Sequence, residues 1–128
     1  MTDQTATIRA IYDAFATGDI ATVLGALDLK IEWIEAAGWA YAGTYTGPDA
    51  VLSGVLARLA DDWNPFHVAP DRVVADGGTV IAVGTYTGTH KATGQSFRAR
   101  FAHICELRDN KIIAFEQVAD TAKINEAT

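Results

Sequence analysis

The sequence predicts an α+β fold in which helices come first and an antiparallel sheet follows. Two observations lead to this prediction: apolar residues recur at helical spacing in the first half, and the second half contains four segments rich in Val, Ile, Thr and aromatic residues, separated by turn residues. Helices followed by a run of strands are typical of the α+β class. The chain has 128 residues, the length of one domain, so we expect residues 1–128 to fold as a single unit.

The first half predicts two helices, a strand and a third helix. The apolar faces of the first two helices consist of Ile8, Ile11, Tyr12 and Phe15, and of Ile20, Val23, Leu24 and Leu27. Gly18 ends the first helix, and Asp19 can cap the second. Residues 30–35 alternate as in a short strand, and residues 36–47 are expected to form a loop. Pro48 suits the first turn of the third helix.

The second half predicts a meander of four strands. They cover residues 66–75, 80–90, 95–107 and 111–119, which are rich in Val, Ile, Thr and aromatic residues. The segments between them contain Gly, Asp and Asn, which tolerate the positive φ angles of hairpin turns. A short helix over residues 121–127 is expected to end the chain.

Composition excludes several classes of function. Ten Lys and Arg against sixteen Asp and Glu give a net charge of −6, so we expect no nucleic-acid partner. No apolar run reaches the ~20 residues of a membrane span, and the polar N-terminus predicts no signal peptide. Cys105 is the single cysteine, which fits a reducing cytoplasm. Three scattered histidines predict no metal site.

Three segments resemble a known family. Residues 11–19 (IYDAFATGD) resemble its first helix and the Gly-Asp break after it, and residues 45–51 (YTGPDAV) resemble its loop into the third helix. Residues 101–121 resemble its final hairpin. The family has the cone-shaped, cystatin-like fold shared by nuclear transport factor 2, ketosteroid isomerases, limonene epoxide hydrolase and SnoaL-like polyketide cyclases. The resemblance implies three N-terminal helices packed on a curved antiparallel sheet, with a pocket between them.

Alternation within the strands predicts which side chains face that pocket. One face of residues 95–107 is the more apolar and is expected inside; it carries Phe97, Ala99, Phe101, His103, Cys105 and Leu107. Arg98 and Arg100 are then expected outside. On the last strand Glu116, Val118 and Asp120 share a face, and the resemblance implies that Asp120 lies in the pocket, where related enzymes carry an acid/base aspartate.

The resulting candidate site combines acid/base groups with apolar walls. The candidate catalytic residues are Asp120, His103 and Glu35, and the candidate substrate-binding residues are Tyr12, Phe15, Trp33, Trp63, Tyr86, Phe101 and Val118. Burial raises the pKa of a carboxyl group, and a second carboxylate raises it further, so one group can act as acid and the other as base. Such chemistry serves isomerases, cyclases and epoxide hydrolases and needs no cofactor. We therefore expect an enzyme acting on a small hydrophobic molecule.

The resemblance is not equally close to every member. None of the three residues of the ketosteroid isomerase triad is kept: their positions correspond to Ile11, Trp33 and residue 102 or 103. The Arg-x-Asp pair of limonene epoxide hydrolase is also missing, because its positions are occupied by Gly84 and Tyr86. The SnoaL-like cyclases fit better, because their pattern asks for little beyond the terminal aspartate and a histidine.

Each candidate also has a structural interpretation. Asp120 can cap the last helix, His103 can be a satisfied core residue, and Glu35 can be exposed at a strand end. The alternative function is a non-catalytic module for small-molecule binding or dimeric assembly. Relatives commonly pair through the outer face of the sheet, so a homodimer is expected, with Thr85, Thr87, Ala102 and Ile104 on that face.

Overall fold

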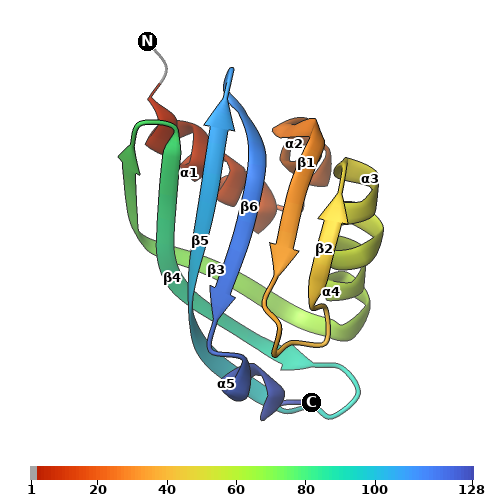
Figure 1. Ribbon diagram of the computed structural model, residues 1–128. Coiled ribbons are helices and arrows are strands. Elements are labelled where there is room, and N and C mark those ends of the chain that lie inside the picture. Colours follow the sequence, from red (N-terminus) through yellow and green to blue (C-terminus); the bar gives the residue numbers. More distant parts are fainter. Residues whose placement is uncertain (1–2) are drawn as a thin grey trace.

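The computed structural model describes residues 3–128 and shows a curved six-stranded sheet with α1–α4 packed on one face (Figure 1). The strands are β1 (Leu27–Glu35), β2 (Gly43–Thr46), β3 (Trp63–Asp76), β4 (Thr79–His90), β5 (Ser96–Arg108) and β6 (Lys111–Ala119). Their order in the sheet is β2-β1-β6-β5-β4-β3. Neighbouring strands are antiparallel except β1 and β6, which are parallel. The expected α+β fold with a curved sheet is confirmed.

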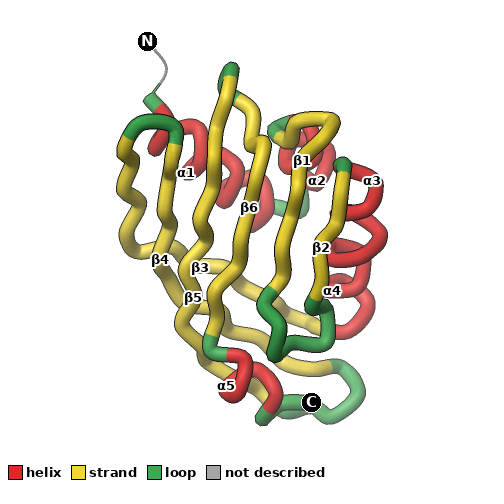
Figure 2. Tube along the Cα trace, viewed as in Figure 1, coloured by secondary structure: helices red, strands yellow, loops and turns green. Residues whose placement is uncertain are grey.

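The helices of the first half cover one face of the sheet, whereas the short last helix lies at the end of the strands (Figure 2). They are α1 (Gln4–Ala16), α2 (Ile20–Gly25), α3 (Pro48–Val51), the π-helical turn η1 (Leu52–Leu56), α4 (Ala57–Asp62) and α5 (Thr121–Asn125). Asp3 and Asp19 cap α1 and α2, because their carboxylates accept hydrogen bonds from backbone N–H groups of the first turn. None of the helices described between residues 3 and 128 is both long and apolar enough to cross a bilayer.

Three features of the first half differ from the sequence-based expectation. The segment expected to be a loop contains β2, which pairs with β1 through Tyr45 opposite Trp33. The third helix is continuous in space, but η1 interrupts its α-helical hydrogen bonding. Leu27, expected at the end of the second helix, begins β1. For β2 and for Leu27, strand pairing outweighs the local pattern.

The apolar core lies between the helices and the inner face of the sheet. Ile31, Val51, Val55 and Val80 are almost completely buried there. On β5 the predicted alternation is confirmed: Phe97 to Leu107 point inward at every second residue, and Arg98 and Arg100 are exposed.

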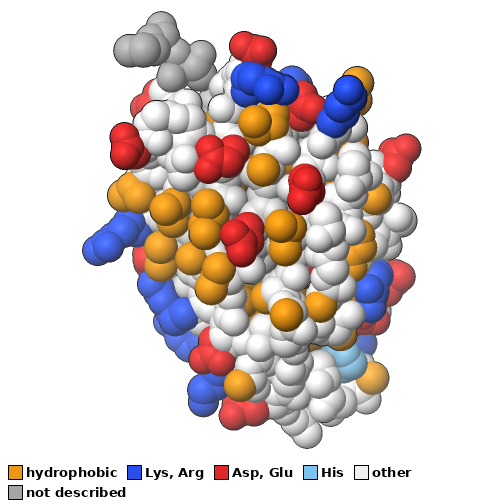
Figure 3. All heavy atoms as spheres, viewed as in Figure 1, with side chains coloured by type: hydrophobic (Ala, Val, Ile, Leu, Met, Phe, Trp, Pro, Cys, Tyr) orange, Lys and Arg blue, Asp and Glu red, His pale blue; other side chains and the backbone are white. Residues whose placement is uncertain are grey.

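The outer face of the sheet carries apolar side chains among acidic ones (Figure 3). A shallow hollow on β1, β5 and β6 is bordered by Ile34, Ile104 and the carboxylates of Glu32, Glu106 and Glu116. The pairing of two copies through this face remains a prediction of the resemblance.

Candidate functional site

A pocket opens between the sheet and the helices and contains about 710 Å³ of empty space, its mouth included. α1, α2, η1 and α4 form one wall, and the inward side chains of β1 and β3–β6 form the other. Most of the lining is aliphatic or aromatic. The hydrogen-bonding side chains that matter here are Tyr12, Glu35, Tyr86, His103 and Gln117. An apolar pocket with a few convergent polar groups is typical of a small-molecule site.

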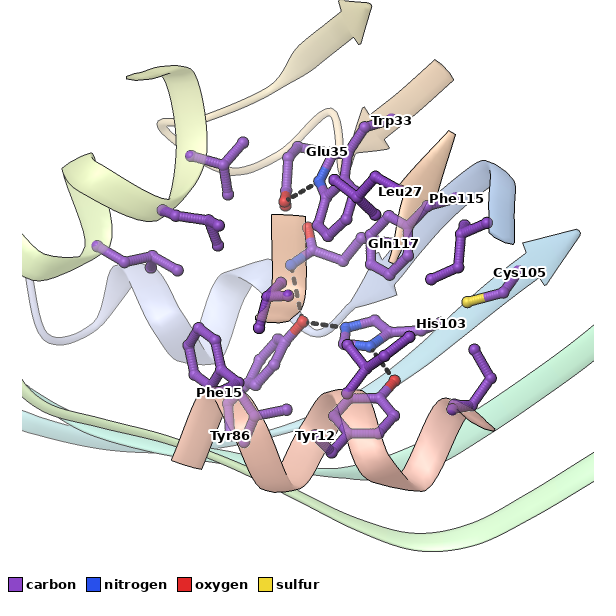
Figure 4. Close-up of a pocket in the computed structure, with 18 of the residues that line it drawn as sticks. Tyr12, Phe15, Leu27, Trp33, Glu35, Tyr86, His103, Cys105, Phe115 and Gln117 are labelled. Atoms are coloured by element: carbon purple, nitrogen blue, oxygen red, sulfur yellow. Dashed lines mark hydrogen bonds between the residues drawn. The ribbon is translucent and has the colours of Figure 1, made fainter. Parts of the chain in front are cut away.

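His103 lies at the centre of the polar groups (Figure 4). Strand alternation turns it inward, and its side chain is buried. The Tyr12 hydroxyl lies 2.6 Å from Nδ1, and the Tyr86 hydroxyl is hydrogen-bonded to Nε2. The ring stacks on Phe101 at a centroid distance of 4.3 Å. Burial lowers the pKa of His103 to about 3, so the imidazole is neutral at physiological pH.

Gln117 joins this network from β6. Its Nε2 donates to the Tyr86 hydroxyl at 2.9 Å, and its Oε1 accepts the backbone N–H of Ala36 at 3.0 Å. Burial raises the pKa of both Tyr12 and Tyr86 above the ordinary tyrosine value, so both hydroxyls stay protonated. The network thus consists of four neutral side chains that all line the pocket.

Glu35 supplies an acid/base group to the same pocket. It ends β1, and because residues two apart share a strand face, Trp33 lies beside it. The Trp33 indole N–H donates to Oε1 at 2.8 Å, whereas Oε2 is buried and has no hydrogen-bond partner among the residues that the structure describes. Burial raises the pKa of Glu35 to about 7. A buried carboxyl group near neutrality with one unpaired oxygen is suited to exchanging a proton with a ligand.

The prediction that Asp120 faces the pocket is wrong. Asp120 is exposed at the end of β6, and its carboxylate accepts the backbone N–H of Lys123 at 3.3 Å as the N-cap of α5. The physical reason is the alternation of side chains along β6. Phe115 and Gln117 point inward, so the even-numbered residues that lead to Asp120 point outward. Val118 belongs to that outer set and is 50% exposed, which corrects its assignment to the pocket as well.

Two further candidates are buried without lining the pocket. Trp63 packs edge-on against Phe97, and its indole N–H donates to Tyr41. Phe101 lies behind the network, stacked on Tyr86 and His103. The predicted pocket positions of Tyr12, Phe15, Trp33, Glu35, Tyr86 and His103 match the structure. Gln117 was missed, although its spacing of two from the aromatic Phe115 is the signal that would have found it.

Comparison with known proteins agrees with this architecture. The SnoaL-like domain family matches residues 8–115. A nuclear transport factor 2-like protein from Burkholderia thailandensis is 35% identical, with a TM-score of 0.94 over 99% of this chain and 98% of that one. One from Burkholderia pseudomallei is 26% identical, with a TM-score of 0.91 over 99% and 98% of the two chains.

Among curated proteins, patulin synthesis protein F of Aspergillus clavatus is 31% identical over 84 residues, which are 63% of this chain and 42% of that protein. The matched segment is therefore less than half the length of this relative. The match to the family spans most of the chain, from α1 to β6. The chain therefore belongs to the SnoaL-like domain family.

Proposed function

We propose that the protein is a cofactor-independent enzyme that moves a proton on a small hydrophobic carbonyl compound, as an isomerase or cyclase does. The observation that carries the proposal is the unpaired, buried oxygen of Glu35 in the same pocket as the hydroxyl network of Tyr12, His103 and Tyr86. A curated relative named as a patulin synthesis protein supports a role in making a small molecule.

The proposed chemistry is enolisation. The Glu35 carboxylate takes a proton from the carbon next to the carbonyl, and the electron pair of that C–H bond moves onto the carbonyl oxygen. A hydroxyl of the network donates a hydrogen bond to this oxygen and stabilises the developing negative charge. Return of the proton to a different carbon completes an isomerisation. Alternatively, the enolate carbon attacks a second carbonyl of the same molecule and closes a ring; the electron pair of that C=O bond moves onto its oxygen, which takes the proton held by Glu35.

Deuterium exchange tests this proposal directly. The protein is incubated in D₂O with a panel of hydrophobic ketones and 1,3-diketones, and exchange next to the carbonyl is followed by NMR. Since only the carboxylate form of Glu35 accepts a proton, the rate is expected to fall about tenfold per pH unit below about 7 and to level off above it. Compounds that bind, as judged by thermal shift, yet never exchange faster than in buffer would contradict the proposal.

Non-catalytic binding is the second candidate function. It is favoured by the hydrogen bonds of the pocket, because the polar groups of Tyr86, His103 and Gln117 already have partners without a ligand. The exchange experiment separates the two functions, since a binding module shifts the melting temperature without speeding exchange.

Asp120→Asn is expected to leave the exchange rate within about twofold of wild type and the stability within about 0.5 kcal/mol, because Asn caps a helix as well as Asp does. Exchange rates and thermal unfolding measure both. A fall in the exchange rate by several factors of ten would instead support the catalytic role that the sequence predicted for Asp120.

A further inference from the structure

We infer that Gln117 sets the direction of the hydrogen bonds in the pocket, so that His103 carries its proton on Nδ1 and Tyr12 has the free hydroxyl hydrogen. The direction follows from the resting protein alone. Only the identity of the group that receives this hydrogen, the carbonyl oxygen of a substrate, rests on the proposed function.

The first step is the orientation of the Gln117 amide. A backbone N–H can only donate, so the atom of Gln117 that faces the N–H of Ala36 at 3.0 Å is the carbonyl oxygen. The amide nitrogen is then turned toward the Tyr86 hydroxyl, 2.9 Å away. This contact fixes the amide without reference to the histidine.

The second step concerns the hydrogen of Tyr86. Among the described residues its hydroxyl has two hydrogen-bond partners, the amide nitrogen of Gln117 and Nε2 of His103. An amide nitrogen is a donor and not an acceptor, so the Tyr86 hydrogen can be received only by Nε2. Tyr86 is 3% exposed, which leaves its hydroxyl little access to bulk water as another acceptor.

The third step gives the tautomer of His103. A neutral imidazole has one N–H and one acceptor nitrogen. Because Nε2 accepts from Tyr86, the ring proton is on Nδ1 and is donated to the Tyr12 oxygen at 2.6 Å. The hydrogen of Tyr12 itself then has no acceptor among the described residues, and Tyr12 lines the pocket. If the bonds ran in the reverse direction, the hydrogen without an acceptor would be that of Tyr86, which is more deeply buried than Tyr12.

This direction selects the ligand. At Tyr12 the pocket offers a hydrogen and requires an acceptor, which a ketone, an enolate or a phenolate provides and an ammonium group does not. The three bonds point the same way, from Gln117 through Tyr86 and His103 to Tyr12, and aligned hydrogen bonds strengthen one another. Tyr12 is therefore the residue that polarises the carbonyl, and Gln117 is a positioning residue.

The tautomer can be measured on the wild-type protein without a substrate. Histidine is labelled with ¹⁵N, and couplings between the ring nitrogens and the carbon-bound hydrogens show which nitrogen is protonated. His67→Asn and His90→Asn, both outside the pocket, identify the other two histidines by elimination. A proton on Nδ1 of His103 is expected. A proton on Nε2, or an average over both nitrogens, would overturn the inference.

Gln117→Glu tests the role of the amide itself. An ionised carboxylate has the shape of the amide but accepts the hydrogen of Tyr86. The ring proton is then expected to move to Nε2, which donates to the Tyr86 oxygen, and the bare Nδ1 is expected to accept the hydrogen of Tyr12. The spectrum is recorded at a pH where the carboxyl carbon signal of the introduced side chain shows it to be ionised. A proton that stays on Nδ1 under this condition would show that Gln117 does not set the direction.

These outcomes separate the inference from the proposed function. An active protein whose ring proton lies on Nε2 retains the proposed function and overturns the direction. An inactive protein whose ring proton lies on Nδ1 overturns the proposed function and retains the direction of the hydrogen bonds.

Discussion

Glu35→Gln is expected to lower the rate of proton exchange by about 100- to 10,000-fold, the usual contribution of a general base. The amide keeps an oxygen for the Trp33 indole N–H but cannot take up a proton from a carbon atom. Because the side chains are nearly isosteric, ligand binding is expected to persist. Exchange rates and ligand-induced thermal shifts, recorded on the same samples, measure the two effects separately.

The same substitution is expected to change how stability depends on pH. Burial raises the pKa of Glu35 from 4.5 in the reference state to about 7 in the fold, so the folded protein holds a proton that the unfolded chain has lost between these values. Wild-type stability therefore falls as the pH rises from 4.5 to 7, by about 3 kcal/mol, and levels off above. Glu35→Gln lacks this contribution, so its stability relative to wild type is expected to increase over that range.

Glu116→Gln provides the matched control. It makes the same chemical change on the exposed face of β6, away from the pocket. It is expected to leave exchange unchanged and stability within about 0.5 kcal/mol of wild type. If Glu35→Gln exchanges protons as fast as this control does, Glu35 is not the base. If the two variants show the same pH dependence of stability, Glu35 is not a buried, titrating group.

The sequence predicted the inner face of β5 correctly and that of β6 wrongly, for one physical reason. Alternation divides a strand into two faces but does not say which one is buried. On β5 the inner set contains Phe97, Phe101 and Leu107 against two arginines, so composition settles the choice. On β6 the two sets are closer in polarity, and the resemblance to relatives with a terminal aspartate favoured the set that ends at Asp120. Phe115, the largest side chain of the strand, marks the buried set.

The hydrogen-bond network itself could not be predicted from local patterns. Tyr12 and His103 are 91 residues apart and meet only because α1 crosses the inner face of the sheet. The burial of Glu35 has a similar origin. The sequence placed it at a strand end, where exposure is usual, but the neighbouring Trp33 ring and the pocket wall enclose it. Sequence patterns thus predict several of the residues that reach the pocket, such as Tyr12 and His103, whereas their pairing and protonation come from the tertiary structure.

Gly84→Ala is expected to lower the free energy of unfolding by about 3 kcal/mol, at the upper end of the cost of overpacking. A Cβ at residue 84 would lie 2.3 Å from the backbone oxygen of Ala69, 2.6 Å from Cα of Pro70 and 2.8 Å from the Phe101 ring. Two of these neighbours are backbone atoms of β3, next to an irregularity in its pairing with β4. They cannot move aside as the end of a flexible side chain can. Denaturant unfolding measures the loss.

Gly25→Ala is the matched control, because a Cβ there meets no atom within 4 Å and φ is not positive. It ends α2, where Ala is the better helix former, so its stability is expected to equal or slightly exceed that of wild type. Gly84→Ala is also expected to slow exchange in the molecules that remain folded, since a displaced Phe101 shifts both Tyr86 and His103, on which it stacks. Equal stability of the two variants would show that the backbone of β3 can move away from residue 84. Equal exchange rates would show that the packing of Phe101 against Gly84 does not hold Tyr86 and His103 in place.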